Sequence, residues 1–489
     1  MLFEWVRKFR ENHRRRRNRI LAFFLLSLAG VGLWFAVGTI LKEPPAPYTV
    51  PSQWQSGTFD SPSFGGRVFT IQAGMGHDES VILVHGLGRN ASRDWFKVIP
   101  ALEKRYHVIA FDLPGFGRSE SPDADYTPTA YARLLHEIRT AYAKKRTAVV
   151  GHSMGAAVAL RYAADYPGEL SQLVLVDAAG ILERTAYVKE IAEIPLERID
   201  LPAYLQGAAT SFENVATAII EWLNLAPDPL DLVKGISRYW KQSGLDASQF
   251  TIALELLDEN YSSAIYGIHL PCAVLWGGRD RIAPLRTAKV LAGHIDGAVL
   301  HIFPEAGHVP MATDTQAFNA TLLALLEGGR PAPEPRPKPT ATKGTLYCKD
   351  EVGTRYSGHY DTVVIDRCKG VELVDITAKK VSVTASSVAF ENLELNATST
   401  AFEARRSVIV MTNAEISGKN ALRSESSRID MAGGSLRATQ HAVEVETKSR
   451  LIFSICDVDA PGYTGFVHGD YRLKRSALFD AILAPGQSH

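Results

Sequence analysis

A short glycine-flanked motif in the first half of the chain has the residue types needed for nucleophilic chemistry. The sequence GHSMG at 151–155 has the form G-x-S-x-G. It follows the apolar run Thr147–Val150 and precedes an amphipathic stretch at Ala156–Ala164. We therefore expect a tight turn between a strand and a helix, which exposes a serine hydroxyl beside a helix N-terminus. The context predicts Ser153 as a nucleophile for acyl transfer.

A base and an acid for this serine follow later in the chain. A hydroxyl is a poor nucleophile at neutral pH, so it needs a base, and the base needs a carboxylate to fix its tautomer. Asp280 follows the apolar run Cys272–Leu275, and His308 follows the run Val299–Ile302. Both are expected beyond the carboxyl ends of strands, the edge where parallel sheets gather their sites. The order Ser153, Asp280, His308 therefore predicts a catalytic triad.

Backbone N–H groups are expected to stabilise the negative charge that such an attack creates. The sequence HGLG at 85–88 follows the apolar run Ser80–Val84, and a loop of this kind can aim N–H groups at a developing oxyanion. The donors that we expect are the N–H groups of Leu87 and Met154. The sequence DLPGFGRS at 112–119 follows the next predicted strand and indicates a fixed turn.

Two alternatives to this triad stay open. Asp177, at the end of the run Leu173–Val176, could serve as the acid, although Asp280 lies at the usual distance before the histidine. Ser153 could also be inert. His85 and His152 are expected to hold loops in place rather than to react. The sequence contains no His, Asp or Glu cluster with metal-ligand spacing and no phosphate-binding glycine motif, so neither a metal nor a cofactor is expected.

The elements that must position these residues alternate between strand and helix signals. Apolar runs predict strands at Ser80–Val84, His107–Phe111, Thr147–Val150, Leu173–Val176, Cys272–Leu275 and Val299–Ile302. Amphipathic stretches, among them Tyr131–Ala143, separate several of them. This alternation predicts an α/β unit with a mainly parallel sheet over residues 55–328. Residues 181–268 interrupt it and are expected to form a helical cap.

The motifs together resemble the α/β-hydrolase family. The resemblance rests on HG at 85–86, DLPGFGRS at 112–119, GHSMG at 151–155, GGRD at 277–280 and GH at 307–308. It implies an α/β-hydrolase fold with a helical cap. Because the nucleophile is a serine, the chain is most similar to the esterase, lipase and C–C-bond hydrolase branches. It departs from haloalkane dehalogenases and epoxide hydrolases, which carry an aspartate there.

The N-terminus indicates a membrane anchor. Residues 1–19 are rich in arginine and lysine, and residues 20–41 carry no charge. As a helix that apolar run would be about 33 Å long, enough to cross a hydrocarbon core of about 30 Å. It is longer than the apolar region of a cleaved signal peptide, the competing interpretation. We expect a single span with a cytoplasmic N-terminus, a Pro-rich stalk at 42–54 and a periplasmic catalytic domain on a bacterial inner membrane.

The C-terminal part differs in pattern. A Pro-rich linker at 329–343 precedes residues 344–489, where Ser387-Val388, Ser407-Val408 and Ser427-Arg428 recur at intervals of 20, and the alanines at 401, 421 and 442 begin similar segments. Such a period predicts an all-β solenoid, expected to be a right-handed parallel β-helix, with a β-sandwich as the alternative. Stacked coils would bring Cys348 and Cys368 together, so these two could form a disulfide.

Composition excludes some classes of partner. The chain of 489 residues has 53 Lys and Arg against 53 Asp and Glu, which argues against a nucleic-acid partner. The sequence thus predicts a membrane-anchored serine hydrolase that cleaves a small-molecule or lipid ester through an acyl-enzyme. The alternatives are a C–C-bond or thioester hydrolase on the same triad, and a cell-envelope binding or scaffold protein. In the latter, residues 344–489 would bind an envelope polymer or a protein.

Overall fold

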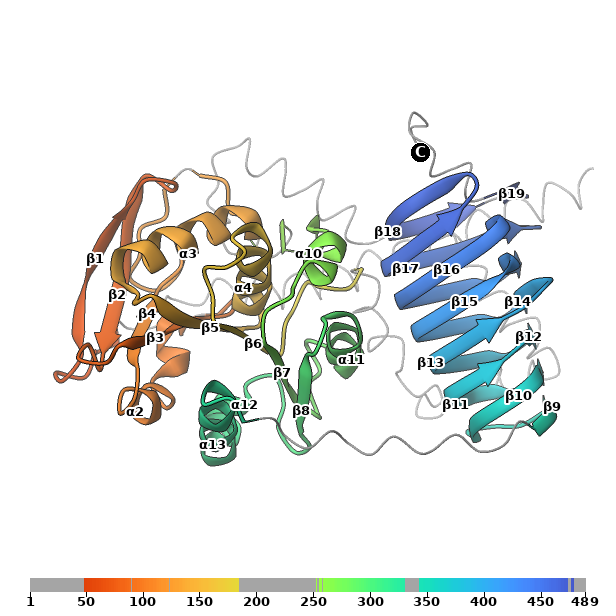
Figure 1. Ribbon diagram of the computed structural model, residues 1–489, viewed down its shortest axis with the longest axis horizontal. Coiled ribbons are helices and arrows are strands. Elements are labelled where there is room, and N and C mark those ends of the chain that lie inside the picture. Colours follow the sequence, from red (N-terminus) through yellow and green to blue (C-terminus); the bar gives the residue numbers. More distant parts are fainter. Residues whose placement is uncertain are drawn as a thin grey trace, which may run out of the picture. The chain divides into compact units, whose positions relative to one another are not determined.

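The computed structural model describes residues 48–88, 90–122, 124–183, 252, 255–256, 258–329, 343–473 and 476–478. From Thr49 onward the chain clusters into one compact unit. Its strands form an eight-stranded sheet, followed in the chain by a coiled sheet of 11 strands (Figure 1). The predicted span at 20–41 and most of the predicted linker lie outside the described residues. Among the residues that are described, no helix is long and apolar enough to cross a bilayer.

The first sheet has the order β1-β2-β4-β3-β5-β6-β7-β8. Its strands are β1 (Gln55–Ser61), β2 (Gly66–Ala73), β3 (Glu79–Val84), β4 (His107–Phe111), β5 (Arg146–His152), β6 (Gln172–Val176), β7 (Cys272–Gly277) and β8 (Val299–Phe303). The pairs β1–β2 and β2–β4 are antiparallel, and every neighbouring pair from β4 to β8 is parallel. The six predicted strands are confirmed as β3 to β8.

The strands that could be predicted from the sequence are mostly the buried ones. β3 to β7 are apolar and almost wholly buried, as expected for parallel strands covered on both faces. β1 is different, because six of its residues are exposed or half-buried and it has no continuous apolar run. β1 and β2 form an antiparallel hairpin at one edge of the sheet, and the sequence prediction missed both of them.

Helices follow several of these strands. They are η1 (Ala91–Trp95), α2 (Ile99–Leu102), α3 (Pro128–Tyr142), α4 (Met154–Asp165), α10 (Ser262–Tyr266), α11 (Leu285–His294), α12 (Pro310–Thr313) and α13 (Thr315–Leu326). α3 begins at Pro128 because the Thr127 side chain accepts a hydrogen bond from the N–H of Ala130 at 3.2 Å.

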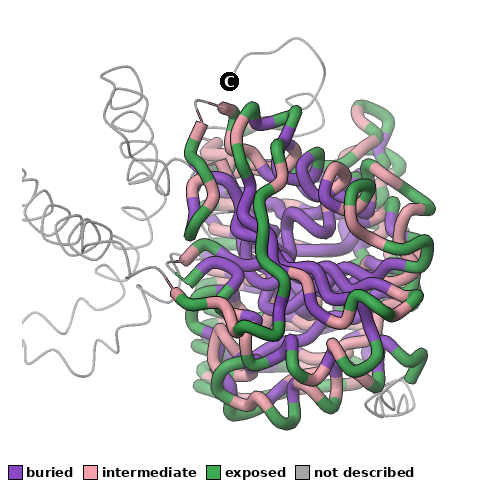
Figure 2. Tube along the Cα trace, turned by 90° about the vertical axis from the view of Figure 1, so that its left-hand side faces the viewer, coloured by how far each residue is buried: buried purple, intermediate pink, exposed green. Residues whose placement is uncertain are grey.

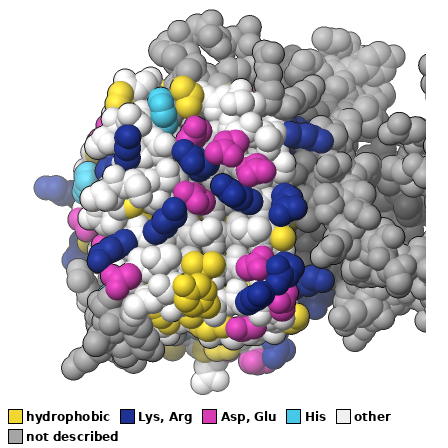
Figure 3. Space-filling view, turned by 90° about the vertical axis from the view of Figure 1, so that its right-hand side faces the viewer, with side chains coloured by type: hydrophobic (Ala, Val, Ile, Leu, Met, Phe, Trp, Pro, Cys, Tyr) yellow, Lys and Arg dark blue, Asp and Glu magenta, His cyan; other side chains and the backbone are white. Residues whose placement is uncertain are grey.

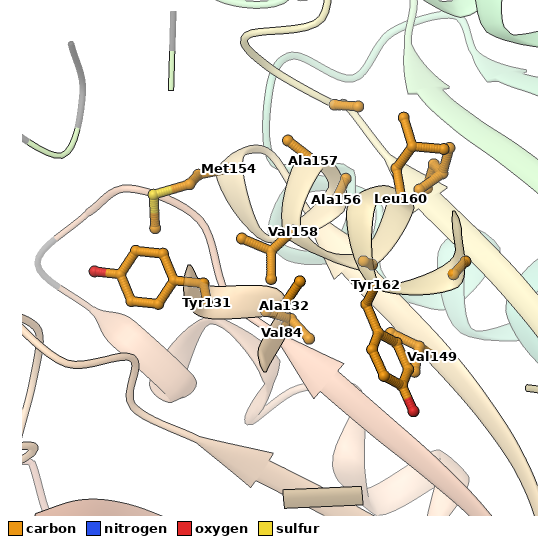
Figure 4. Packing of buried hydrophobic residues seen from close by; sticks show 14 of the residues in the cluster. Val84, Tyr131, Ala132, Val149, Met154, Ala156, Ala157, Val158, Leu160 and Tyr162 are labelled. Atoms are coloured by element: carbon orange, nitrogen blue, oxygen red, sulfur yellow. The ribbon is translucent and has the colours of Figure 1, made fainter. Parts of the chain in front are cut away.

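The core of this part lies between the sheet and its helices. α3 and α4 pack against each other, and the close-up in Figure 4 shows Tyr131 and Val158 among the side chains between them. Figure 2 shows the same core as a buried interior within an exposed outer shell. Most of the predicted cap at 181–268 lies outside the described residues; α10 belongs to its C-terminal end.

The second sheet winds as a solenoid. Its strands are β9 (Lys343–Lys349), β10 (Arg355–Asp366), β11 (Lys369–Ala378), β12 (Lys380–Thr384), β13 (Ser387–Asn396), β14 (Thr400–Arg405), β15 (Val408–Glu425), β16 (Arg428–Val445), β17 (Ser449–Ala460), β18 (Tyr463–Leu473) and β19 (Ala477–Leu478). From β9 to β17 neighbouring coils pair in parallel. Parallel coils exclude the β-sandwich alternative, because a sandwich is built from antiparallel sheets. The right-handed sense of the coil stays a prediction.

A repeated turn explains the sequence period. Arg367, Ala385, Arg406 and Ser426 all have φ between 48° and 54°, one in each successive coil. Each is followed at once in the chain by a buried residue, and a buried serine ladder runs through this turn. The N–H of Ser386 donates to Ser407 Oγ at 3.2 Å, and the ladder continues through Ser407, Ser427 and Ser449.

The register corrects one sequence prediction and confirms two. Ser387 lies opposite Val408, so the serine aligned with Ser407 is Ser386. The alanine repeat is aligned as predicted, because Phe402 lies opposite Leu422 and Leu422 opposite Val443. A disulfide joins Cys348 to Cys368 across Cα atoms 6.7 Å apart, which confirms that this pair is bridged.

Charges of both signs cover the outside of the solenoid. Oppositely charged side chains on neighbouring coils pair with each other, as in Lys380–Glu403 and Arg423–Glu444, both at 2.9 Å. Figure 3 shows Lys and Arg interspersed with Asp and Glu on the face that it displays. On the displayed face, charges of the two signs therefore alternate instead of forming a patch of one sign.

Side chains of α11 contact the outer face of β15 and β16. Arg286 donates to Asp430 Oδ1 at 2.7 Å and to Thr412 Oγ1 at 3.0 Å, and the Asp430 side chain is only 1% exposed. Lys289 forms an ion pair with Glu391 at 2.6 Å. No motif indicated these contacts, which join residues more than 100 positions apart.

Candidate active site

Ser153 lies at a strained turn between β5 and α4. Its φ of 54° and ψ of −120° are unusual for a residue with a side chain. Glycines on either side make the turn possible. A Cβ on Gly151 would lie 2.2 Å from the carbonyl oxygen of Gly155, and one on Gly155 would lie 2.3 Å from that of Val84. The G-x-S-x-G pattern is thus dictated by backbone packing.

The structure brings the three predicted triad residues into one hydrogen-bonded chain. His308, in the loop after β8, places Nε2 2.9 Å from Ser153 Oγ. Its Nδ1 lies 2.7 Å from Asp280 Oδ2, in the loop after β7. Because Nδ1–H donates to the carboxylate, Nε2 is left to accept the serine proton. This is the arrangement in which imidazole can act as a base.

Asp280 is held as a carboxylate. Its side chain is fully buried, and burial alone would raise its pKa. The hydrogen bond from His308 and the N–H groups of Ile282 and Ala283, at 2.7 and 3.0 Å, outweigh that effect. The pKa of Asp280 therefore lies below its usual value. The negative charge needed to stabilise an imidazolium is present at neutral pH.

His152 supports the base rather than the nucleophile. Its Nε2 lies 2.7 Å from the carbonyl oxygen of His308 and donates to it. Burial, followed by the nearby His308, lowers the pKa of His152 to about 3. His152 is thus neutral throughout the physiological range and can hold the backbone of His308 in place. The sequence suggested only a supporting role, because the contact spans 156 positions.

The loop at 85–88 lies directly against Ser153. A Cβ on Gly86 would come within 2.8 Å of the Ser153 Cβ. His85 fixes this loop, since its Nδ1 donates to the Gly86 carbonyl at 2.7 Å and its Nε2 accepts the N–H of Leu113 at 2.9 Å. Met154 is the first residue of α4, so its N–H is not used within the helix. The oxyanion role of the N–H groups of Leu87 and Met154 stays a prediction.

The predicted fixed turn at 112–119 is built around a buried aspartate. Asp112 accepts hydrogen bonds from the N–H and hydroxyl of Ser92, at 2.9 and 2.6 Å, and from the N–H of Arg118 at 2.8 Å. Gly117 has a φ of 54°, and a Cβ there would lie 2.2 Å from Asp112 Oδ2. Sequence reasoning missed Ser92, which no motif indicates.

Asp177 lies beside the triad but not in the acid position. Its Oδ1 accepts the N–H of Gly277 at 2.8 Å, and Asp280 occupies the hydrogen bond to His308 Nδ1. Asp177, Asp280 and His308 each place one polar atom within 4.8 Å of the others, a spacing that could also suit a metal ion. Both oxygens of Asp280 already accept hydrogen bonds, so the group is arranged as a hydrogen-bond network.

Comparison with known proteins agrees with this geometry. A profile of the Alpha/beta hydrolase family matches residues 81–321. Lipase 3 of Moraxella sp. is 31% identical over 249 residues, which cover 49% of this chain and 77% of the lipase. The chain belongs to the α/β-hydrolase family.

Two further proteins are similar to this chain. A 2-hydroxy-6-oxononadienedioate/2-hydroxy-6-oxononatrienedioate hydrolase of Comamonas testosteroni is 28% identical over 272 residues, covering 54% of this chain and 92% of that enzyme. The solved structure of an esterase from Exiguobacterium antarcticum matches with a TM-score of 0.41 and 20% identity, covering 56% of this chain and 100% of the esterase.

Proposed function

We propose that this protein is a serine hydrolase that cleaves carboxylic esters through an acyl-enzyme. The observation that carries the proposal is the hydrogen-bonded chain from Ser153 through His308 to Asp280. The geometry suits each role: His308 directs Nε2 at the Ser153 hydroxyl and Nδ1 at Asp280, and the pKa of Asp280 lies below its usual value. The strained backbone of Ser153 adds to this, since such strain is common at nucleophiles.

The first half of the reaction forms the acyl-enzyme. Ser153 Oγ attacks the carbonyl carbon of the ester while its proton moves to His308 Nε2. The N–H groups of Leu87 and Met154 stabilise the oxyanion. The bond to the alcohol then breaks, and the proton on Nε2 passes to the alcohol oxygen. Asp280 stabilises the imidazolium throughout this half-reaction.

The second half releases the acid. A water molecule gives a proton to His308 Nε2 and attacks the acyl carbon. The tetrahedral intermediate collapses, Ser153 Oγ leaves, and the proton returns to it from Nε2. No cofactor or metal is needed, because the nucleophile, the base and the oxyanion donors all come from the chain.

A carboxylic ester is the substrate class that we favour. The relation to Lipase 3 supports an ester, including a lipid ester. The relation to the Comamonas testosteroni hydrolase favours a second candidate, hydrolysis of a C–C bond on the same triad. The side chains that bound the acyl pocket would choose between these substrates.

We further propose that the protein is anchored in a bacterial inner membrane with its catalytic domain in the periplasm. The uncharged run at 20–41 and the basic segment before it support the anchor. The Cys348–Cys368 disulfide supports an oxidising compartment. An envelope polymer or a protein partner for residues 344–489 also stays a proposal.

The test is hydrolysis of p-nitrophenyl esters of increasing acyl length by the full chain in detergent micelles. We expect turnover that S153A abolishes while its unfolding midpoint stays close to that of the wild type. Ester turnover by S153A close to the wild-type rate would refute the proposal. Cleavage of a vinylogous 1,5-diketone without any ester turnover would favour the second candidate.

A further inference from the structure

A second buried carboxyl group lies against the triad, and the proposed reaction does not use it. Asp177 follows β6 and is completely buried. Its N–H donates to the carbonyl of Leu275 on the neighbouring β7 at 3.0 Å, and its Oδ1 accepts the N–H of Gly277 at 2.8 Å. These bonds fix its side chain beside the end of β7, where the loop that carries Asp280 begins.

The surroundings of Asp177 Oδ2 indicate that this carboxyl group is protonated. Oδ2 is buried and has no hydrogen-bond partner if Asp177 is treated as a carboxylate. One oxygen of the Asp177 carboxyl group lies within 4.8 Å of both an Asp280 oxygen and a His308 ring nitrogen. A buried charged oxygen without a donor is costly, whereas a protonated one can donate to a neighbouring acceptor.

The two carboxyl groups compete for a single negative charge. Two buried carboxyl groups with oxygens within 4.8 Å of each other cannot both ionise without a large penalty. Asp280 receives three hydrogen bonds, from His308 Nδ1 and two backbone N–H groups, and Asp177 receives one. The negative charge therefore belongs to Asp280 and the proton to Asp177.

We propose that Asp177 is a positioning residue: its protonated carboxyl donates a hydrogen bond from Oδ2 to Asp280 and thereby holds that carboxylate on His308. This inference rests on the proposed function of the triad. Asp280 and His308 are the titratable groups that share the cluster with Asp177 among the described residues. The extra donor would keep Asp280 from turning away from Nδ1 and would make it a weaker base than His308.

The electrostatics agree with this geometry. Burial raises the pKa of Asp177 well above its usual value. The N–H of Gly277 acts in the opposite direction, and the neighbouring Asp280 adds to the rise. The two neighbours thus have opposite shifts, with the pKa of Asp280 lowered and that of Asp177 raised.

Two substitutions of Asp177 distinguish a role as a hydrogen-bond donor from a role as a negative charge. The φ of Asp177 is 45°, a conformation that asparagine and glycine accept without strain. In D177N the amide can accept the N–H of Gly277 and donate to Asp280, as the neutral acid does. We expect kcat/KM within about threefold of the wild type and an unchanged pH profile. In D177G the donor is lost, and kcat should fall about tenfold with little change in KM.

Infrared difference spectroscopy gives a readout that does not depend on turnover. The wild-type minus D177N spectrum at neutral pH should contain the carbonyl band of a protonated carboxylic acid. A carboxylate band in its place would overturn the proposal. The proposal would also be overturned if D177N were as impaired as D177G. A shift of the acid limb of the D177N kcat/KM profile toward lower pH would overturn it as well.

Labelling with a fluorophosphonate distinguishes this failure from failure of the proposed function. In that reaction the nucleophile displaces fluoride from phosphorus, whatever the natural substrate is. An unlabelled wild-type chain would mean that the triad does not act as proposed. A labelled wild type with labelling of D177N reduced to the D177G rate would instead contradict the role of Asp177 alone.

Discussion

At the residue scale, the site depends on hydrogen bonds that set protonation states. The sequence predicted Ser153, Asp280 and His308 because each follows a strand and lies at the sheet edge where parallel strands end. It left Asp177 open as an alternative to Asp280, since the two occupy similar positions after neighbouring strands, and the hydrogen bond from His308 to Asp280 decides between them. That choice depends on loop geometry, which no local pattern encodes.

Replacing the triad carboxylate with an amide should strongly reduce turnover. In Asp280→Asn the amide can donate to His308 Nδ1, which favours the tautomer that carries the proton on Nε2 and cannot accept from Ser153. We expect kcat to fall by about 10³- to 10⁴-fold with the fold intact. Ester turnover measures the effect, and the exposed Asp296→Asn is the matched control. A loss smaller than tenfold in D280N would contradict this assignment.

The acid limb of the pH profile of kcat/KM should reflect the titration of a single group. Because the pKa of Asp280 is lowered, its charge persists until the pH falls below the usual carboxylate range, and only then are its charge and its stabilising effect lost. Asp280 should therefore stay charged across the acid limb, and the rise of log kcat/KM with pH should have a limiting slope of one. A slope of two from steady-state kinetics would mean that a second group titrates with it.

At the element scale, the solenoid is held in register by side chains inside its turns. The sequence period was visible because Ser407 and Ser427 lie one coil apart and bond across the coils. The hairpin of β1 and β2 was not visible, because β1 is mostly exposed and lacks an apolar run. Sequence patterns therefore predict buried strands better than edge strands.

Removing one serine of the ladder should weaken the solenoid. In Ser407→Ala the N–H of Ser386 loses its buried acceptor, an effect of about 1–3 kcal/mol on the free energy of unfolding. Urea unfolding followed by circular dichroism measures this. Ser399→Ala is the control, because that side chain is exposed. Equal stability of S407A and S399A would show that the ladder contributes nothing.

At the scale of the whole molecule, the contacts between α11 and the solenoid make the two sheets interdependent. Arg286 donates to Asp430 and Thr412, so its guanidinium is held mostly by solenoid residues. Neither composition nor any motif predicts this pairing, since Arg286 and Asp430 each resemble an ordinary surface charge in the sequence. Only the three-dimensional arrangement buries them.

Replacing Arg286 alone should lower the free energy of unfolding more than replacing both Arg286 and Asp430. Arg286→Ala removes the guanidinium that pairs with the buried Asp430 carboxylate, and the expected loss of unfolding free energy is about 3–5 kcal/mol. The double variant R286A/D430N should recover part of that loss. The urea midpoint of each variant tests this, with the exposed Arg281→Ala as control. An R286A midpoint equal to that of R281A would refute the energetic role of the contact.

The disulfide gives a prediction about the compartment. The chain has four cysteines, of which Cys272 and Cys456 are free and buried. Protein purified from its native membrane and denatured without reductant should therefore react with a thiol reagent at two sites. After reduction, four sites should react, and stability should fall by about 3 kcal/mol for a loop of this length. Four reactive thiols before reduction would contradict a periplasmic location.

Identification of the covalent acyl-enzyme would show whether Ser153 is the nucleophile. The full chain would be mixed with an ester whose acyl-enzyme hydrolyses slowly, quenched in acid, digested and examined by mass spectrometry. We expect one acyl adduct, on the peptide that contains Ser153, and no adduct in S153A. Steady ester turnover with no adduct on that peptide, or with an adduct on another residue, would contradict a Ser153 nucleophile.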